Sequence, residues 1–169
     1  MKIRLLVMGM LVAAIVAANV GHVRAASAPK PPSAKKFDDL AKSALDAMKK
    51  RAAELNVTGV AVVSYAQGDT IQGWTSRMAV VGRMKDDPTA TSKGNNLLGV
   101  AYAKSAEMAR TLVNSGTSTG TIMTGEFGWQ GGVVEHVKGG YLIVSFSGGK
   151  SEDDVQVSKA GLAVMKNGL

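Results

Sequence analysis

The sequence predicts an α+β domain, and three observations support this fold class. Two segments have the period of amphipathic helices, and a third helix is predicted near the end of the chain. Between the helices lie two pairs of apolar segments that contain many β-branched residues, with glycine in the turn that joins each pair. The order helix, hairpin, helix, hairpin, helix is typical of a sheet with helices packed against it.

The first 25 residues are interpreted as a secretion signal. Lys2 and Arg4 precede an apolar stretch over residues 5–20, and Val23-Arg24-Ala25 resembles a cleavage site. A transmembrane anchor is the alternative, but the apolar stretch is slightly short for one and polar residues follow it. Residues 26–36 combine three prolines with serine and lysine and are predicted to be disordered, which leaves residues 37–169 as a single domain.

Composition excludes several kinds of site. The chain of 169 residues contains no cysteine, so disulfides, zinc–thiolate sites and thiol nucleophiles are excluded. The formal charge is +7, but Lys2, Arg4 and Arg24 lie in the predicted signal. Without them the excess of basic over acidic residues is about four, which together with few aromatic residues argues against nucleic acid as a partner.

The first half of the domain is predicted to contain one helix and one hairpin. Residues 37–55 place their apolar side chains on one helical face, beginning with Phe37. Residues 59–65 form a continuous apolar strand, and residues 70–78 are the predicted return strand. Residues 79–94 are predicted to be irregular.

The second helix is predicted over residues 95–114. Its apolar stripe includes Ala101 and Met108, and Lys104, Glu107 and Arg110 are assigned to the opposite, solvent-facing side. Residues 115–128 form a long loop rich in threonine and glycine. A polar loop of this length in a small domain is often functional.

The last part of the chain is the best-defined unit. Residues 131–137 and 141–146 are strands, and Lys138-Gly139-Gly140 supplies the turn between them. A helix is predicted from Ser151, with Ser151 as its N-cap and Asp154, three residues later, placed to bond back to the cap. Residues 147–151 lack the first glycine of a phosphate loop, and the acidic residues that follow them would repel phosphate.

His136 is the single histidine that remains after the predicted signal. A Ser-His-Asp mechanism would have to use it, but the sequence has no Gly-x-Ser-x-Gly elbow. Its place beside the hairpin turn predicts an exposed position, either as an ordinary surface residue or as an axial or metal ligand. We therefore expect no enzymatic activity and no protein-only metal site.

The sequence resembles the GlcG/HbpS-like haem-binding family over roughly residues 37–169. The most specific match runs through Gly131-Gly132-Val133-Val134, the Lys138-Gly139-Gly140 turn, and residues 144–149, with Asp153 and Asp154 beyond. Weaker matches are residues 59–63 to the first core strand, Arg77-Met78 to an R-M pair, and Ala101-x-x-Lys104 to a helix motif. The chain departs from the family at Ser64, where an aspartate is usual, and at Val134, where a proline is usual.

The resemblance implies a profilin-like domain with an antiparallel sheet of about five strands flanked by helices, usually oligomeric. It also implies an extracytoplasmic protein, periplasmic or secreted, that binds haem or a similar small ligand in scavenging or sensing. Haem needs apolar contact, cations near its propionates and an axial donor. His136 and Met123 are the candidate donors, Trp129 could cover a porphyrin face, and Lys138 could reach a propionate. The alternative is a non-catalytic accessory or structural homo-oligomer associated with a catabolic or cofactor-processing pathway.

Overall fold

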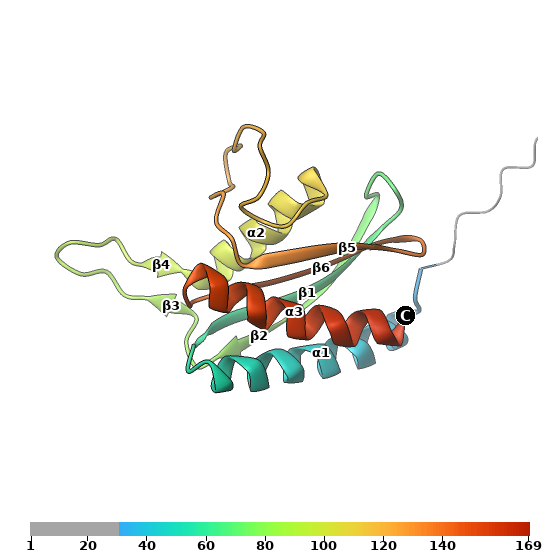
Figure 1. Ribbon diagram of the computed structural model, residues 1–169, viewed down its shortest axis with the longest axis horizontal. Coiled ribbons are helices and arrows are strands. Elements are labelled where there is room, and N and C mark those ends of the chain that lie inside the picture. Colours follow the sequence, from blue (N-terminus) through green and yellow to red (C-terminus); the bar gives the residue numbers. More distant parts are fainter. Residues whose placement is uncertain (1–30) are drawn as a thin grey trace, which may run out of the picture.

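The computed structural model describes residues 31–169, which form three helices and two antiparallel sheets (Figure 1). The predicted signal, residues 1–25, and the start of the predicted lead-in lie outside the described residues. In chain order the elements are α1 (Ala34–Glu54), β1 (Gly59–Gln67), β2 (Gly73–Val81), β3 (Lys85–Asp86), β4 (Asn95–Asn96), α2 (Leu97–Thr111), β5 (Gly132–Val137), β6 (Gly140–Ser147) and α3 (Ser151–Gly168). The predicted α+β class is confirmed. No helix within residues 31–169 is long and apolar enough to span a membrane.

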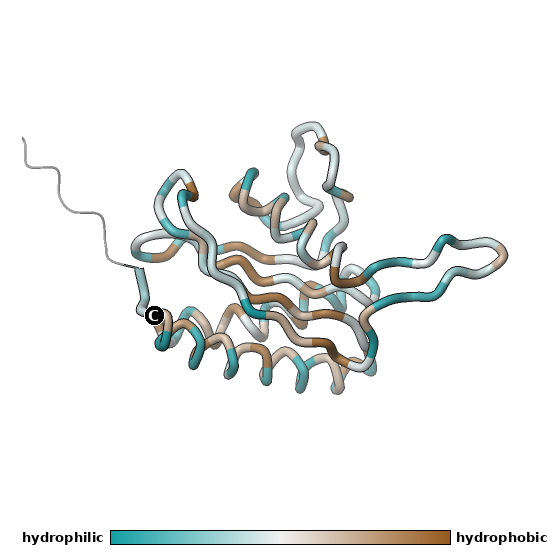
Figure 2. The backbone as a smooth tube through the Cα atoms, turned by 180° about the vertical axis from the view of Figure 1, so that it is seen from behind, coloured by the Kyte–Doolittle hydropathy of each residue, from teal (hydrophilic) through white to brown (hydrophobic). Residues whose placement is uncertain are grey.

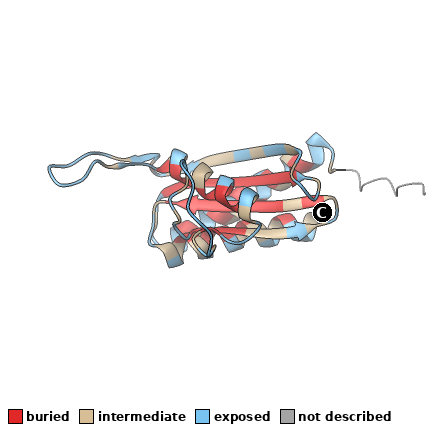
Figure 3. Ribbon diagram, turned by 90° about the horizontal axis from the view of Figure 1, so that it is seen from above, coloured by how far each residue is buried: buried red, intermediate tan, exposed pale blue. Residues whose placement is uncertain are grey.

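The main sheet has four antiparallel strands in the order β2-β1-β6-β5. The central strands β1 and β6 are buried along almost their whole length, whereas β2 and β5 are edge strands (Figure 3). Strands β3 and β4 pair only with each other and carry an exposed arm that projects from the domain (Figure 3). In place of one sheet of about five strands, the domain has a four-stranded sheet and a separate two-stranded arm.

Helices cover both faces of the main sheet, with α1 and α3 on one side and α2 on the other (Figure 1). The alternation of side chains along β1 explains both layers. Ala61, Val63 and Tyr65 pack against α1 and α3, whereas Val60 and Val62 pack against α2. Both faces of β1 are buried, and its sequence is accordingly apolar except for Ser64 and the terminal Gln67. Figure 2 shows hydrophobic residues concentrated along the strands of the sheet.

The starts of two elements in the first half differ from the sequence prediction. Helix α1 begins at Ala34 because the Ser33 Oγ accepts a hydrogen bond from the Lys36 N–H at 3.3 Å, so residues 34–36 of the predicted lead-in are helical. Strand β2 begins at Gly73 and not at residue 70. The reason is a longer turn, in which Gly68 and Ile71 have φ of 82° and 38° and the Gln72 N–H bonds to Gln67 O.

Two longer predictions also need correction. Strand β2 continues to Val81 and β3 occupies Lys85–Asp86, so residues 79–94 are not irregular throughout. Helix α2 spans Leu97–Thr111 and not residues 95–114, because residues 95–96 pair as β4 and Leu112 adopts a left-handed conformation that ends the helix.

Two further corrections concern charged residues. Lys150 is the N-cap of α3 and makes no side-chain capping bond, so the prediction that Ser151 caps this helix is wrong. The predicted solvent-facing side of α2 is also wrong in part, because Lys104 and Glu107 are both buried. The residues concerned lie in one region of the fold, where α2, β6 and α3 meet.

Candidate functional site

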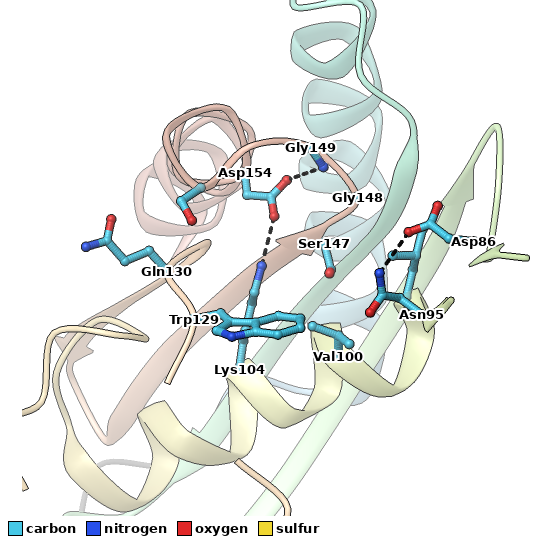
Figure 4. A pocket seen from close by; sticks show the side chains of 12 residues that line it. Asp86, Asn95, Val100, Lys104, Trp129, Gln130, Ser147, Gly148, Gly149 and Asp154 are labelled. Carbon is cyan, nitrogen blue, oxygen red and sulfur yellow. Dashed lines mark hydrogen bonds and ion pairs between the residues drawn. The ribbon is translucent and has the colours of Figure 1, made fainter. Parts of the chain in front are cut away.

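A buried ion pair joins α2 to α3 across the end of β6 (Figure 4). The Lys104 Nζ donates to Asp154 Oδ2 at 2.8 Å and to the Phe146 carbonyl oxygen at 2.9 Å. Asp154 Oδ1 in turn accepts a hydrogen bond from the Gly149 N–H at 2.8 Å. The Lys104 and Asp154 side chains are only 3% and 4% exposed, so both charges are removed from water and depend on each other.

Burial shifts the pKa values of both members of this pair. Burial lowers the pKa of Lys104 and raises the pKa of Asp154, while the attraction between the two groups opposes both shifts. A cavity of about 130 Å³ opens beside the pair and is lined in part by Trp129, Ser147 and Ser151 (Figure 4). We call it the ion-pair pocket. Its small volume and the mutual pairing of its charges favour a structural role over ligand binding.

A larger and more apolar depression lies between α2 and the β1–β2 hairpin. This α2–β2 groove has a volume of about 590 Å³. It is lined by Thr70, Ile71, Trp74, Tyr102, Ala106, Ala109 and Arg110. The volume falls within the range of about 300–1,000 Å³ that is typical of small-ligand sites. The groove exists because α2 packs over β1 and β6 and leaves the same face of β2 uncovered.

The groove combines aromatic surface with two polar groups. Trp74 on β2 is 39% exposed, so its ring is available to a ligand. The Tyr102 hydroxyl lies 3.2 Å from Ser76 Oγ. A tyrosine oxygen can take part in hydrogen bonds and can also bind haem iron. Arg110 supplies a cation at the rim, where its guanidinium makes two bonds with the Glu126 carboxylate, at 2.6 and 2.7 Å.

His136 lies outside the groove, on strand β5, beside the β1–β2 turn that forms one wall of the groove. Its side chain is 62% exposed, and Nε2 lies 3.7 Å from Asp69 Oδ1 in the β1–β2 turn. Its ring packs edge to face on the ring of Tyr141, with the two ring centroids 4.9 Å apart. Asp69 directly precedes Thr70 and Ile71 of the groove. Within residues 31–169, no group of three or more histidine or acidic side chains could hold a metal ion.

The other sequence-predicted site residues do not converge with His136. Met123 is 55% exposed in the loop that follows α2. Trp129 belongs to the same loop, packs on Phe127 with ring centroids 4.9 Å apart and lines the ion-pair pocket. Lys138 lines a different cavity, beside α1 and α3. The four predicted residues are thus distributed over several surfaces and do not line a common cavity.

Sequence reasoning missed three residues that line the groove, namely Trp74, Tyr102 and Arg110. A signal was present, since residues 102, 106, 109 and 110 follow helical spacing and form a stripe of their own on α2. Nothing in that spacing showed that the turn after β1 would reach this stripe.

The Arg110–Glu126 ion pair connects the loop after α2 to that helix. Because the pair requires an ionised Glu126, we predict that acid breaks this contact. The hydrogen bond from Arg110 holds the pKa of Glu126 below its ordinary value of 4.5, with help from the Met123 N–H. A depressed carboxyl pKa contributes stability that is present above the ordinary value and is lost as the pH falls through the folded-state value. We expect the loop to detach from α2 below pH 4.5, seen as a change in Trp129 fluorescence in a Trp74→Phe background. Glu126→Gln should abolish this transition, and its persistence in that variant would contradict the assignment.

Comparisons with known proteins establish the fold. No family model matches the sequence, and no curated protein matches it significantly. The structure is similar to the crystal structure of a PduOC–haem complex, with 16% identity, a TM-score of 0.50, and coverage of 80% of this chain and 95% of that one. It is also similar to the Klebsiella pneumoniae protein ORFY, a DUF336 protein, with 17% identity, a TM-score of 0.50, and coverage of 76% and 88%.

These findings define the chain as a small α+β domain that carries ligand-sized depressions on its surface. More particularly, its fold is GlcG/DUF336-like. That fold is the one the sequence motifs implied, and the similarity at these identities extends to architecture and not to individual site residues.

Proposed function

We propose that this protein binds haem reversibly in the α2–β2 groove. The observation that carries the proposal is the composition of the groove, which brings together an apolar wall, an aromatic ring, a phenol and a guanidinium. These are the contacts that a porphyrin ring, an iron and a propionate each require. The proposal is supported by the fold, since PduOC shares the architecture and is described as a haem complex.

Each lining residue has a defined part in this arrangement. Trp74 and Ile71 offer apolar contact from the hairpin. On the facing side of α2, Ala106 and Ala109 have small side chains, which leave room for a planar ring to approach the helix. Tyr102 is the proposed iron ligand, because it is the phenol within the groove. Arg110 is the proposed propionate partner, and it would share its N–H groups between the propionate and Glu126.

The depth of the groove sets the expected affinity. The groove is an open depression in which Trp74 is 39% exposed before any ligand binds, so we expect one side of a bound porphyrin to remain in contact with water. An open site with a single protein ligand buries less of the ring than a closed site with two ligands, and binding is correspondingly weaker and reversible. Such a site suits transfer or sensing of haem more than permanent retention as a prosthetic group.

A haem titration followed by absorbance tests the proposed ligand. We expect a Soret shift with wild-type protein, and at least about tenfold weaker binding with an altered spectrum in Tyr102→Phe, because the phenol oxygen is lost while the ring stays. His136→Ala and Met123→Ala are matched controls from outside the groove and should titrate like wild type. Loss of the shift in His136→Ala alone would place the iron at the histidine and contradict the assignment to Tyr102.

We also propose that the protein acts outside the cytoplasm, as a homo-oligomer and without catalytic activity of its own. Support for the location is the signal-like pattern of the first 25 residues. Support for assembly is the edge strand β2, nine residues long and without proline, which leaves main-chain groups open for pairing. Mass spectrometry of the mature N-terminus and light scattering test the first two statements, and turnover that is lost in His136→Ala would overturn the third.

A further inference from the structure

A second ligand-sized cavity lies on the opposite layer of the domain from the α2–β2 groove. It has a volume of about 530 Å³ and is formed where the N-terminal part of α1, the C-terminal part of α3 and the β5–β6 turn come together. We call it the lysine cavity, because Lys36, Lys138 and Lys166 contribute to its lining from these three elements. The other lining residues are Pro32, Tyr65, Val137 and Leu169.

Three lysines bring positive charge to the lining, and two of them already have partners. None of the seven lining side chains is acidic. Lys166 forms an ion pair with Glu135, and Lys36 donates to the main-chain oxygen of Leu169 at 3.4 Å. Within residues 31–169, Lys138 has no acidic group within ion-pair distance, and it is exposed at the turn. Lys138 is therefore the lysine of this lining that is left to attract an anion, and the ammonium groups of Lys36 and Lys166 add to the positive field beside it.

The rest of the lining is apolar and firmly held. Tyr65 is 4% exposed, and its hydroxyl donates to the Gly139 carbonyl oxygen at 2.8 Å, which fixes the β5–β6 turn over the cavity. Burial raises the pKa of Tyr65, so this phenol keeps its proton and adds no negative charge. Val137 and Pro32 supply aliphatic surface beside it. A ligand that fits must therefore have an anionic head and an apolar body.

We propose that the lysine cavity binds an aliphatic carboxylate, with the carboxylate near Lys138 and the chain against Tyr65 and Val137. Each feature of such a ligand has a matching feature in the cavity: the carboxylate would contact the Lys138 ammonium group, and the chain would contact the apolar wall. The volume of about 530 Å³ accommodates a chain of medium length. This site is separate from the proposed haem site, because the two linings share no residue.

Calorimetric titration with dodecanoate tests the proposal. We expect saturable binding to wild type and about tenfold weaker binding to Lys138→Glu, since charge reversal at the turn replaces attraction by repulsion. Lys159→Glu is the matched control, because it makes the same charge change at an exposed position of α3 outside the lining, and it should bind like wild type.

Two further titrations test whether the carboxylate is recognised and whether the ligand sits in this cavity. Dodecanol has the same chain without the charge and should bind at least about tenfold more weakly than dodecanoate if the lysines recognise the carboxylate. Ala106→Trp, which fills the α2–β2 groove, should leave dodecanoate binding unchanged. The proposal is overturned if wild type does not bind dodecanoate, if dodecanol binds equally well, if Lys138→Glu and Lys159→Glu behave alike, or if Ala106→Trp abolishes binding.

Discussion

Replacing Asp154 by alanine is expected to lower the free energy of unfolding by about 3–5 kcal/mol, which is the usual cost of leaving one member of a buried ion pair alone. The Lys104 ammonium would lose its counter-charge while remaining 3% exposed, and the Gly149 N–H would lose its acceptor. Because α2 and α3 both depend on this contact, the loss should affect global stability. Urea denaturation followed by circular dichroism measures it.

A double variant provides the control for this prediction. Lys104→Met with Asp154→Leu removes both charges and keeps apolar volume, and exchanges of this kind are often neutral or stabilising. We expect the double variant to recover most of the stability that Asp154→Ala loses. If Asp154→Ala lost less than about 1 kcal/mol, the pair would not carry the structural role assigned to it.

Gly131→Ala is expected to produce the second large effect. Gly131 has φ of 136°, and a Cβ there would overlap Lys104 Nζ and stand 2.9 Å from both Asp154 Cβ and the Phe146 carbonyl oxygen. Backbone strain and overpacking each cost about 1–3 kcal/mol, so we expect a total loss of about 2–6 kcal/mol in urea denaturation.

A second glycine separates the two causes. Gly125 has φ of 95°, but a Cβ there would have no atom within 4 Å. Gly125→Ala therefore measures the backbone cost without the crowding and should be clearly milder than Gly131→Ala. Equal losses in the two variants would show that the close approach of Gly131 to the ion pair is unimportant.

Regular structure was predictable because it depends on local periodicity. The helical stripe that begins at Phe37 and the β-branched run of β1 are both readable over a few turns or residues, and both elements form where they were predicted. Boundaries were less predictable, because the start of α1 depends on one hydrogen bond from Lys36 to Ser33.

The ion pair could not be read from helical spacing. Lys104 and Asp154 are 50 residues apart, and each belongs to a helix where a charged side chain is normally placed on the solvent side. Their burial follows from the way α2 and α3 meet at the end of β6, which is a tertiary arrangement. The close fit around Gly131 explains why glycine stands at this point of the motif.

The binding surfaces were only partly predictable for a similar reason. The sequence indicated that the loop after α2 is of a kind that is often functional, but its contacts are tertiary: Arg110 binds Glu126, and Trp129 lines the ion-pair pocket. The α2–β2 groove depends on how the β1–β2 turn approaches α2. Residue chemistry could name His136 as a candidate haem ligand, and that stays a prediction, whereas the place of Tyr102 in the groove depends on the surrounding elements.

Haem titration of a groove-filling variant is the most direct test of the central claim. Ala106 is an exposed residue of α2 in the groove lining, so Ala106→Trp places an indole where the porphyrin would lie. Ala163→Trp makes the same exchange at an exposed position of α3, on the other side of the sheet. We expect Ala106→Trp to weaken haem binding by at least about tenfold and Ala163→Trp to leave it unchanged. Equal haem affinity in the two variants, or no Soret shift in the wild type, would contradict the account.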